Sequence, residues 1–251
     1  MCLILFANEV HPKYKRIVAS NRDEYYQRPT APVHFWEDHP EILAGRDLEK
    51  MGTWMGVTIT GRFGALTNYR DPKENSSGKR SRGELVADAL KYRGNIKDYF
   101  QTLNNKNEEY PGYNLLVGDQ DGLYYYSNIG KEMLEVGPGI YGLSNHLLNT
   151  DWPKVRKGKE GMDKIIQKHS EDMIEDLFCL LQNSDYAPDE LLPNTGVSLE
   201  WERMLSPLFI MSKDYGTRSS TVLLQSDSEM IYSERIYTKE GINEHTFKLT
   251  L

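Results

Sequence analysis

The sequence is poor in cysteine, because its 251 residues include only Cys2 and Cys179. Two cysteines so far apart cannot form the framework of closely spaced pairs that stabilises small disulfide-rich domains. Cys179 lies in an apolar stretch with helical spacing, so we expect it to be buried and unreactive. This leaves Cys2 as the candidate reactive thiol.

Long hydrophobic runs are also lacking, and no apolar stretch reaches the ~18 residues of a membrane span. The apolar run over residues 2–7 is short, has no basic segment before it and is not followed by a small-residue cleavage site. We therefore expect no integral membrane segment and no signal peptide, and we predict a cytoplasmic location.

Positive charge is in the minority, with 30 Lys and Arg against 37 Asp and Glu and a net charge of −7. This balance argues against nucleic acid or an anionic membrane as the main partner. The basic clusters at residues 79–82 and 154–159 are interrupted by other residues, so we expect them on solvated faces or at helix ends.

Common catalytic and cofactor motifs are missing as well. The chain has no glycine-rich phosphate loop, no C-x-x-C, no H-E-x-x-H and no G-x-S-x-G. His34, Glu37, Asp38 and His39 are close in sequence, but they fall in an expected loop that does not aim them at one point. We predict neither a metal site nor a cofactor.

Hydrophobic residues make up 39% of the chain and charged residues 27%, which is typical of a globular protein with a real core. Alternating patterns predict hairpins, with helices grouped between them. The expected strands are residues 2–7, 16–20, 53–60, 62–68, 113–118, 123–128, 133–136, 140–144, 218–225, 229–237 and 245–249. Two helices are expected to start at the capping signals Ser81–Glu84 and Asn95, and three more are expected over residues 153–169, 171–183 and 199–205. Residues 21–49 are predicted to be mostly loop, with a short strand at 32–36. This order favours antiparallel sheets with helices stacked outside them, in a single domain over residues 1–251.

Cys2 directly follows the initiator Met1, and methionine aminopeptidases remove Met1 when the next side chain is small. Removal would place a thiol and an α-amine on one residue. The amine titrates near pH ~7.7–8.0 and the thiol near ~8.5, so the amine can take the thiol's proton. Cys2 would then be a nucleophile that carries its own base. The alternative is a small hydrophobic residue in an N-terminal strand.

Polar residues stand where four expected strands begin or end. They are Asn21-Arg22-Asp23-Glu24, Thr67-Asn68, Ser144-Asn145 and Thr217-Arg218. Each group alone fits a turn. Together with Cys2 they supply what a thiolate attacking an amide needs: a carboxylate for the amine, amide donors for the oxyanion and a cation.

Met1-Cys2-Leu3-Ile4, Ser20-Asn21-Arg22-Asp23-Glu24 and Leu66-Thr67-Asn68 resemble the family named for its Asn-Arg-Asp-Glu motif, also called the transport-and-Golgi-organisation family. That family is similar to the N-terminal-nucleophile hydrolases, nearest to the penicillin V acylase and bile-salt hydrolase branch. The resemblance implies a four-layer αββα sandwich, an α/β fold of α+β type with two antiparallel sheets between helical layers.

The resemblance also implies roles for single residues. Cys2 matches the nucleophile, Asp23 the carboxylate that orients its amine, and Asn68 the oxyanion-hole amide. Asn145 matches a second active-site asparagine and Arg218 a late active-site arginine. The acylases carry an arginine three residues before the carboxylate, where this chain has Ser20. Arg22 is the candidate replacement, and Asn21 and Glu24 are candidate supporting or substrate-binding residues.

Two functions follow from this resemblance. The first is an N-terminal-cysteine amidohydrolase that cleaves a non-peptide C–N bond, such as that of an N-acyl amide. The alternative is a non-catalytic protein that binds an apolar ligand, such as a lipid, an acyl group or a haem-like molecule, on the same scaffold. Either protein would take a small molecule as its partner, and a homo-oligomer is compatible with both.

We predict that the mature protein starts at Cys2 with an unblocked amine, because the proposed base exists only after Met1 is removed. Intact-mass spectrometry of active protein measures this directly. A mass that includes Met1 or an acetyl group would contradict the mechanism.

Overall fold

The computed structural model describes residues 2–168 and 172–251, and the chain divides into two compact units. The first unit is made of the described residues of 1–27, 138–144 and 148–248, and the second of 28–137, 145–147 and 249–251. Each unit is built on one antiparallel sheet. The single domain expected from the sequence stays a prediction.

The sheet of the first unit has six strands in the order β10-β1-β2-β11-β12-β13. The predicted first hairpin is confirmed, since β1 pairs antiparallel with β2 from Cys2↔Arg22 to Asn8↔Arg16. On its other side β2 pairs with β11, so it lies in the interior of the sheet. The bounds are β1 Cys2–Asn8, β2 Arg16–Tyr25, β10 Gly139–Leu143, β11 Tyr215–Gln225, β12 Glu229–Thr238 and β13 Gly241–Thr250.

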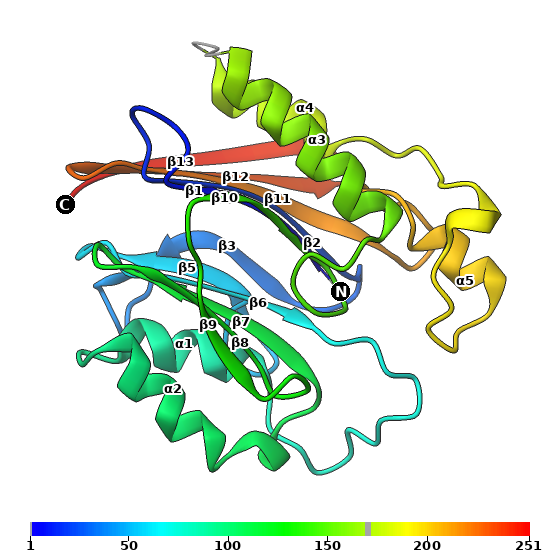
Figure 1. Ribbon diagram of the computed structural model, residues 1–251, viewed down its shortest axis with the longest axis horizontal. Helices are drawn as coiled ribbons and strands as arrows, with labels where there is room; N and C mark the ends of the chain where they lie inside the picture. Colours follow the sequence, from blue (N-terminus) through cyan, green and yellow to red (C-terminus); the bar gives the residue numbers. More distant parts are fainter. Residues whose placement is uncertain (1, 169–171) are drawn as a thin grey trace. The chain divides into compact units, whose positions relative to one another are not determined.

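Helices α3 (Pro153–Lys168) and α4 (Met173–Leu181) cover one face of this sheet (Figure 1). Alternate residues of β1, Leu3 and Leu5, join their apolar faces in one core cluster. Both helices were predicted, and their expected ends at residues 169 and 171 lie outside the described residues. The same unit holds η2 (Asp189–Leu191) and α5 (Leu199–Met204).

Helix α3 lies very close to the sheet because a glycine stands on each side of their contact, Gly158 in the helix and Gly142 in the sheet. A Cβ on Gly158 would lie 2.6 Å from the Leu5 side chain in β1. A Cβ on Gly142 in β10 would lie 2.6 Å from Val155 in α3. The two missing side chains therefore set the depth at which α3 packs on β1 and β10.

The sheet of the second unit has seven strands in the order β3-β4-β5-β6-β7-β8-β9. Helices α1 (Gly83–Lys91) and α2 (Ile96–Asn104) cover one of its faces (Figure 1). Asn95 caps α2 as predicted, with its side chain accepting from the Lys97 N–H at 2.8 Å. The strands are β3 Thr30–Phe35, β4 Ile42–Asp47, β5 Met55–Thr58, β6 Phe63–Asn68, β7 Tyr113–Gly118, β8 Leu123–Ser127 and β9 Glu132–Glu135, and η1 covers Asn107–Glu109.

Helix α1 begins slightly later than its sequence signal indicated. The Glu84 carboxylate accepts from the Ser81 N–H at 3.3 Å, which is half of the predicted capping box. Arg82 is the N-cap residue, and no side chain caps the helix there. The strands predicted around residues 133–136 and 140–144 both form, but β9 pairs with β8 whereas β10 pairs with β1, so they belong to different sheets.

The prediction that residues 21–49 are mostly loop is wrong. Strand β2 continues to Tyr25, and β3 and β4 form a further antiparallel pair. Pro32 is tolerated because β3 is an edge strand and its register with β4 shifts between Ala31 and His34. Pairing on both sides of β2 outweighs the turn preference of its Asn and Asp residues.

The predicted fold class is confirmed in each unit, since both sheets are antiparallel and both carry helices on one face. Within residues 2–168 and 172–251, no helix combines the length and the apolar character that crossing a bilayer requires.

We predict that Gly158→Ala lowers the free energy of unfolding, because the added methyl group overpacks against Leu5 at a cost of about 1–3 kcal/mol. The ~1 kcal/mol by which alanine is the better helix former offsets part of this cost, which leaves a net loss of up to about 2 kcal/mol. Chemical denaturation measures the change. Gly137→Ala is the matched control, since its Cβ would meet nothing within 4 Å. A Gly158→Ala protein more stable than the wild type would contradict the close helix–sheet contact.

Candidate functional site

Cys2 and Arg22 lie directly opposite each other at one end of the β1–β2 pair. Residues paired across antiparallel strands project from the same face, so the guanidinium of Arg22 lies on the face of the thiol. Ser20 is two residues earlier in β2 and shares that face. A cation at Arg22 therefore reaches the side of the sheet from which an arginine at position 20 would project.

The Cys2 thiol is buried, with 8% of the residue exposed. Burial raises its pKa, and the Asp23 carboxylate acts in the same direction. The charge of Arg22 and a hydrogen bond from the Asp23 backbone lower the pKa in part. A thiol with a raised pKa rests in its protonated form, so its use as a nucleophile requires a base.

Asp23 projects from the face of β2 opposite to Arg22 and is 1% exposed. The Thr217 hydroxyl donates to Asp23 Oδ1 at 2.7 Å. The same hydroxyl oxygen accepts from the Ile210 N–H at 2.9 Å, which leaves its hydrogen directed at the carboxylate. Thr217 therefore fixes the orientation of Asp23.

Burial raises the pKa of the Asp23 carboxyl, and the Lys154 ammonium is the strongest influence that lowers it. Lys154 stands in the first turn of α3 and is only 3% exposed. Residues 154–159 were expected on a solvated face or at a helix end, and Lys154 does stand at a helix end, but it is buried there. Its position was readable from spacing, because Lys154, Gly158, Met162 and Ile166 recur every four residues and all four are buried.

Asn21 and Glu24, the candidate supporting residues, both have hydrogen-bond partners within the first unit. Asn21 Nδ2 donates to the carbonyls of Leu181 at 2.9 Å and Leu208 at 2.8 Å, and its Oδ1 accepts from the Ser220 hydroxyl at 2.5 Å. These bonds tie the end of α4 and the segment after α5 to the sheet. Glu24 is half-buried and accepts from the N–H of its neighbour Tyr25 at 2.9 Å.

Arg218 occupies an irregular position in β11. The register with β2 passes from Thr217↔Asp23 to Ser219↔Arg22, so Arg218 is the additional residue of a β-bulge. Its Nη1 donates to the Tyr25 carbonyl at 2.9 Å, and the residue is partly exposed. The bulge thus places Thr217 opposite Asp23 and directs Arg218 to the end of β2.

Asn68 and Asn145 belong to the second unit and lie together there. Asn145 is fully buried, and its Nδ2 donates to the Asn68 carbonyl at 2.9 Å. The Asn145 carbonyl accepts from the Arg70 N–H at 2.8 Å. Asn145 therefore holds the end of β6, where Asn68 stands.

The predicted site residues thus fall into two groups. The first unit brings together Cys2, Arg22 and Asp23 on paired strands, with Arg218 at the neighbouring bulge. The second unit brings together Asn68 and Asn145. Sequence reasoning missed Lys154 and the role of Thr217, both of which act on Asp23.

Cys179 is exposed, so the prediction that it is a buried core residue is wrong. In α4 the buried positions include Leu177, Phe178 and Leu181, and Cys179 lies two residues from the first and last of these, on the outer side of the helix. Its Sγ donates to Glu175 Oε1 at 3.7 Å. The helical spacing was correct, but it does not place every apolar residue of the stretch on the inner face.

Among the described residues, no three His, Cys, Asp or Glu side chains are grouped to hold a metal ion. In the segment considered for a metal site, Asp38 instead binds the Arg46 guanidinium through two hydrogen bonds of 2.6 and 2.7 Å. These bonds lower the pKa of Asp38 to about 2.

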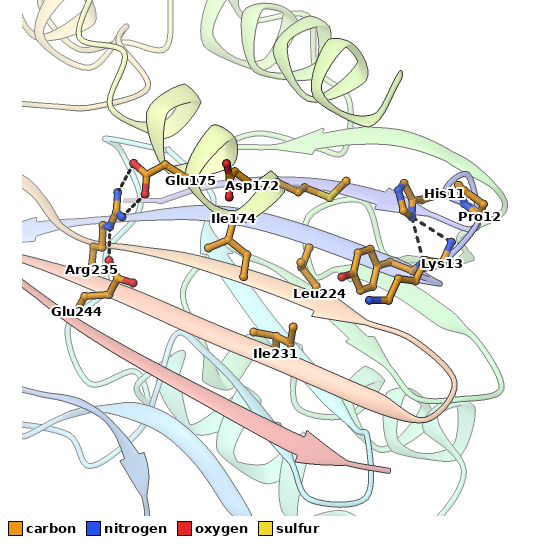
Figure 2. A pocket seen from close by; sticks show the side chains of 12 residues that line it. His11, Pro12, Lys13, Asp172, Ile174, Glu175, Leu224, Ile231, Arg235 and Glu244 are labelled. Atoms are coloured by element: carbon orange, nitrogen blue, oxygen red, sulfur yellow. Dashed lines mark hydrogen bonds and ion pairs between the residues drawn. The ribbon is translucent and has the colours of Figure 1, made fainter. Parts of the chain in front are cut away.

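A cavity of about 610 Å³ lies in the first unit between the β1–β2 loop, the start of α4 and strands β11 to β13. Figure 2 shows an apolar floor that includes Leu224 and Ile231, with Arg235 between Glu175 and Glu244 at one end. The loop is at the opposite end of β1 from Cys2. None of the predicted site residues lines this cavity.

Comparison with known sequences identifies the family. The model of the family described as Transport and Golgi organisation 2 matches residues 1–239. A Bos taurus protein named Transport and Golgi organization protein 2 homolog is 34% identical over 279 residues, which cover 99% of this chain and 99% of that protein. The resemblance drawn from the sequence motifs is confirmed.

Two solved structures share the fold at low sequence identity. The C2A mutant of conjugated bile acid hydrolase from Clostridium perfringens has a TM-score of 0.56 and 11% identity, covering 100% of this chain and 96% of that one. An N-acylethanolamine-hydrolyzing acid amidase orthologue from Caenorhabditis elegans has a TM-score of 0.51 and 8% identity, covering 89% and 92%. These likenesses show the N-terminal-nucleophile hydrolase fold that the resemblance implied.

We predict that Arg22→Gln slows alkylation of Cys2 by iodoacetamide about tenfold at fixed pH. Removing the cation raises the pKa of the thiol, and a rise of one in that pKa lowers the thiolate fraction about tenfold. Peptide mapping after brief labelling measures the rate in protein shown to be folded by circular dichroism. Cys179 is the internal control, because Arg22 is not among the charges that act on it. An equal change at both cysteines, or no change at Cys2, would contradict the role of Arg22.

Proposed function

We propose that this chain, which belongs to the Transport and Golgi organisation 2 family, is an N-terminal-cysteine amidohydrolase that cleaves a non-peptide C–N bond. The observation that carries the proposal is the arrangement around β2. Cys2 stands opposite a cation, Arg22, and the next residue along β2 is a buried carboxylate, Asp23, which is oriented by Thr217. A packed strand residue has no need of two buried charges beside it.

The base in this proposal is the α-amine of Cys2, present once Met1 has been removed. Because burial raises the pKa of the thiol, the proton must be taken by a group close to the sulfur. An amine on the same residue meets this need, as it does in N-terminal threonine enzymes. Asp23 would hold that amine in place and stabilise it once it is protonated.

The reaction follows from these groups in two stages. The thiol proton passes to the amine, and the sulfur attacks the amide carbonyl carbon to give a tetrahedral oxyanion. The C–N bond breaks and the leaving nitrogen takes the proton, which leaves a thioester on Cys2. Water then attacks the thioester, the C–S bond breaks, and the sulfur regains a proton as the carboxylic acid leaves.

Asn68 is the proposed oxyanion donor, a role that the resemblance supplies. Its backbone is held by Asn145, which supports a preorganised position for its side chain. Arg218 is the proposed contact for a polar group of the substrate, because it is the partly exposed residue of the bulge. An N-acyl amide is the proposed substrate class. The cytoplasmic location and a homo-oligomeric state stay predictions.

A second candidate function is supported by the cavity of the first unit. Its volume of about 610 Å³ lies within the ~300–1,000 Å³ typical of small-molecule sites. Leu224 and Ile231 offer an apolar floor, and no cysteine lines it. A protein that carries an apolar ligand there would have no use for Cys2 as a nucleophile.

We predict that a panel of N-acyl amides, penicillin V and acyl-amino acids contains at least one compound that leaves a mass adduct on Cys2 and is turned over. Cys2→Ala should bind that compound without turnover, because it keeps the surroundings and loses the sulfur. Asn68→Ala should lower the rate by about 10²–10³, the usual cost of one oxyanion donor. Mass spectrometry and steady-state kinetics measure these outcomes.

A protein that only binds its ligand is expected to give the opposite result in this panel. No adduct and no turnover across the panel, together with tight binding of an apolar ligand that Cys2→Ala leaves intact, would overturn the enzyme. If that binding were lost in Leu224→Gln but not in Cys2→Ala, the ligand would be assigned to the cavity.

A further inference from the structure

Lys154 carries an ammonium group into the interior of the first unit. The residue is 3% exposed, although it stands at the start of a helix whose other lysines include the exposed Lys164. Lysine is almost never fully buried unless it is paired with an opposite charge. Its location therefore requires an acidic neighbour at the same depth.

The packing of α3 directs Lys154 toward the sheet. Gly158, one turn later on the same face of the helix, lies against Leu5 of β1 so closely that a Cβ would approach to 2.6 Å. Side chains on a helix lean toward its N-terminus, so Lys154 extends along the sheet beyond Leu5. The two neighbouring buried positions, Gly158 and Met162, keep the helix at this depth.

Asp23 projects from the same face of the sheet. Asn21, two residues earlier in β2, bonds the Leu181 carbonyl of α4, which establishes that this face meets the helices. Leu3, the partner of Asn21 in β1, belongs to the core cluster with α3 and α4. Lys154 and Asp23 are thus buried on one side of one sheet, and their charges interact.

A buried carboxylate without a cation takes up a proton and becomes neutral. A neutral carboxyl group cannot stabilise an ammonium that forms beside it. Three positive charges lower the pKa of Asp23: Lys154 from α3 has the largest effect, followed by the N-terminal amine and then by Arg22 from β2. The nearby thiol of Cys2 and the hydroxyl of Thr217 are uncharged at rest.

We propose that Lys154 is a positioning residue whose ammonium keeps the buried Asp23 carboxylate ionised, so that Asp23 can orient and stabilise the α-amine of Cys2. The part that concerns the amine rests on the proposed function, whereas the charge pair itself does not. Lys154 contacts no substrate in this proposal and acts only through Asp23.

The test compares how stability depends on pH in Lys154→Met, Asp23→Asn and the double variant. Lys154→Met leaves the carboxylate without this cation, which raises its pKa further. A group with a raised folded-state pKa stabilises the protein at low pH and loses that contribution as pH rises. The loss of stability in Lys154→Met should therefore grow with pH. The ratio of the unfolding equilibrium constants of the variant and the wild type should rise at least tenfold between about pH 5 and pH 8.

The loss of stability in Asp23→Asn should instead shrink as pH rises. Burying the Lys154 ammonium without this carboxylate destabilises the protein most at low pH, where the ammonium must stay charged. The double variant removes both charges and should have a nearly pH-independent difference from the wild type. Lys154→Arg keeps the charge and should restore most of the stability at high pH. Lys164→Met is the matched control on the exposed side of the same helix and should change nothing.

The proposed effect of Lys154 on the α-amine of Cys2 is tested by alkylating Cys2 in protein that starts at Cys2. Lys154→Met should shift the pH profile of labelling in the same direction as Asp23→Asn does, because both variants remove the negative charge of Asp23 near the thiol, and adding Lys154→Met to Asp23→Asn should change the labelling rate no more than twofold further. A pH-independent loss of stability in Lys154→Met, or multiplicative effects of the two substitutions on labelling, would overturn the proposal. If Lys154→Met and Asp23→Asn show opposite pH dependences of stability but the protein turns over no substrate, the charge pair between Lys154 and Asp23 is supported. That result counts only against the proposed function.

Discussion

The pairing of β2 with a strand on each side is the constraint on which the site of the first unit depends. Through β1 it sets Cys2 opposite Arg22, and through β11 it sets Thr217 opposite Asp23. Side chains alternate between faces with a period of two, so a slip of one residue would exchange the faces of Arg22 and Asp23. The register is held by the apolar residues of β1 and by Asn21, whose three hydrogen bonds are possible from one face only.

The bulge at Arg218 adjusts this register where it matters. Beyond Ser219 the two strands pair regularly, and the extra residue shifts the alignment so that Thr217 meets Asp23. Thr217 is in turn held by Ile210 through its hydroxyl and its backbone N–H. Bulges commonly redirect side chains in this way next to functional sites.

Charge is buried here on both faces of one strand. Arg22 shares the face of Cys2, whereas Asp23 and Lys154 share the face that meets the helices. Each of these charges would be costly alone in a medium of low dielectric constant, so placing opposite charges near one another offsets part of the cost of burying them. A cation two positions along β2 from Ser20 also keeps the same face, so Arg22 stays the candidate replacement for an arginine at that position.

Much of this protein could be predicted from its sequence. Alternation in residues 2–7 and 16–20 predicted the first hairpin, and Asn95 predicted the start of α2, because these signals depend on local preferences. Cys2, Asp23, Asn68, Asn145 and Arg218 were candidates before their placement was known, since their residue types match one chemistry. Local preference failed where pairing partners came from far along the chain. Residues 21–25 read as a turn until β1 and β11 paired with them. The four-residue spacing of α3 places Lys154 on the face of Gly158, but only the tertiary structure decided that this face is buried and that Cys179 is exposed. The orientation of a helix on its sheet depends on close contacts such as Gly158 with Leu5, which the helix does not encode by itself.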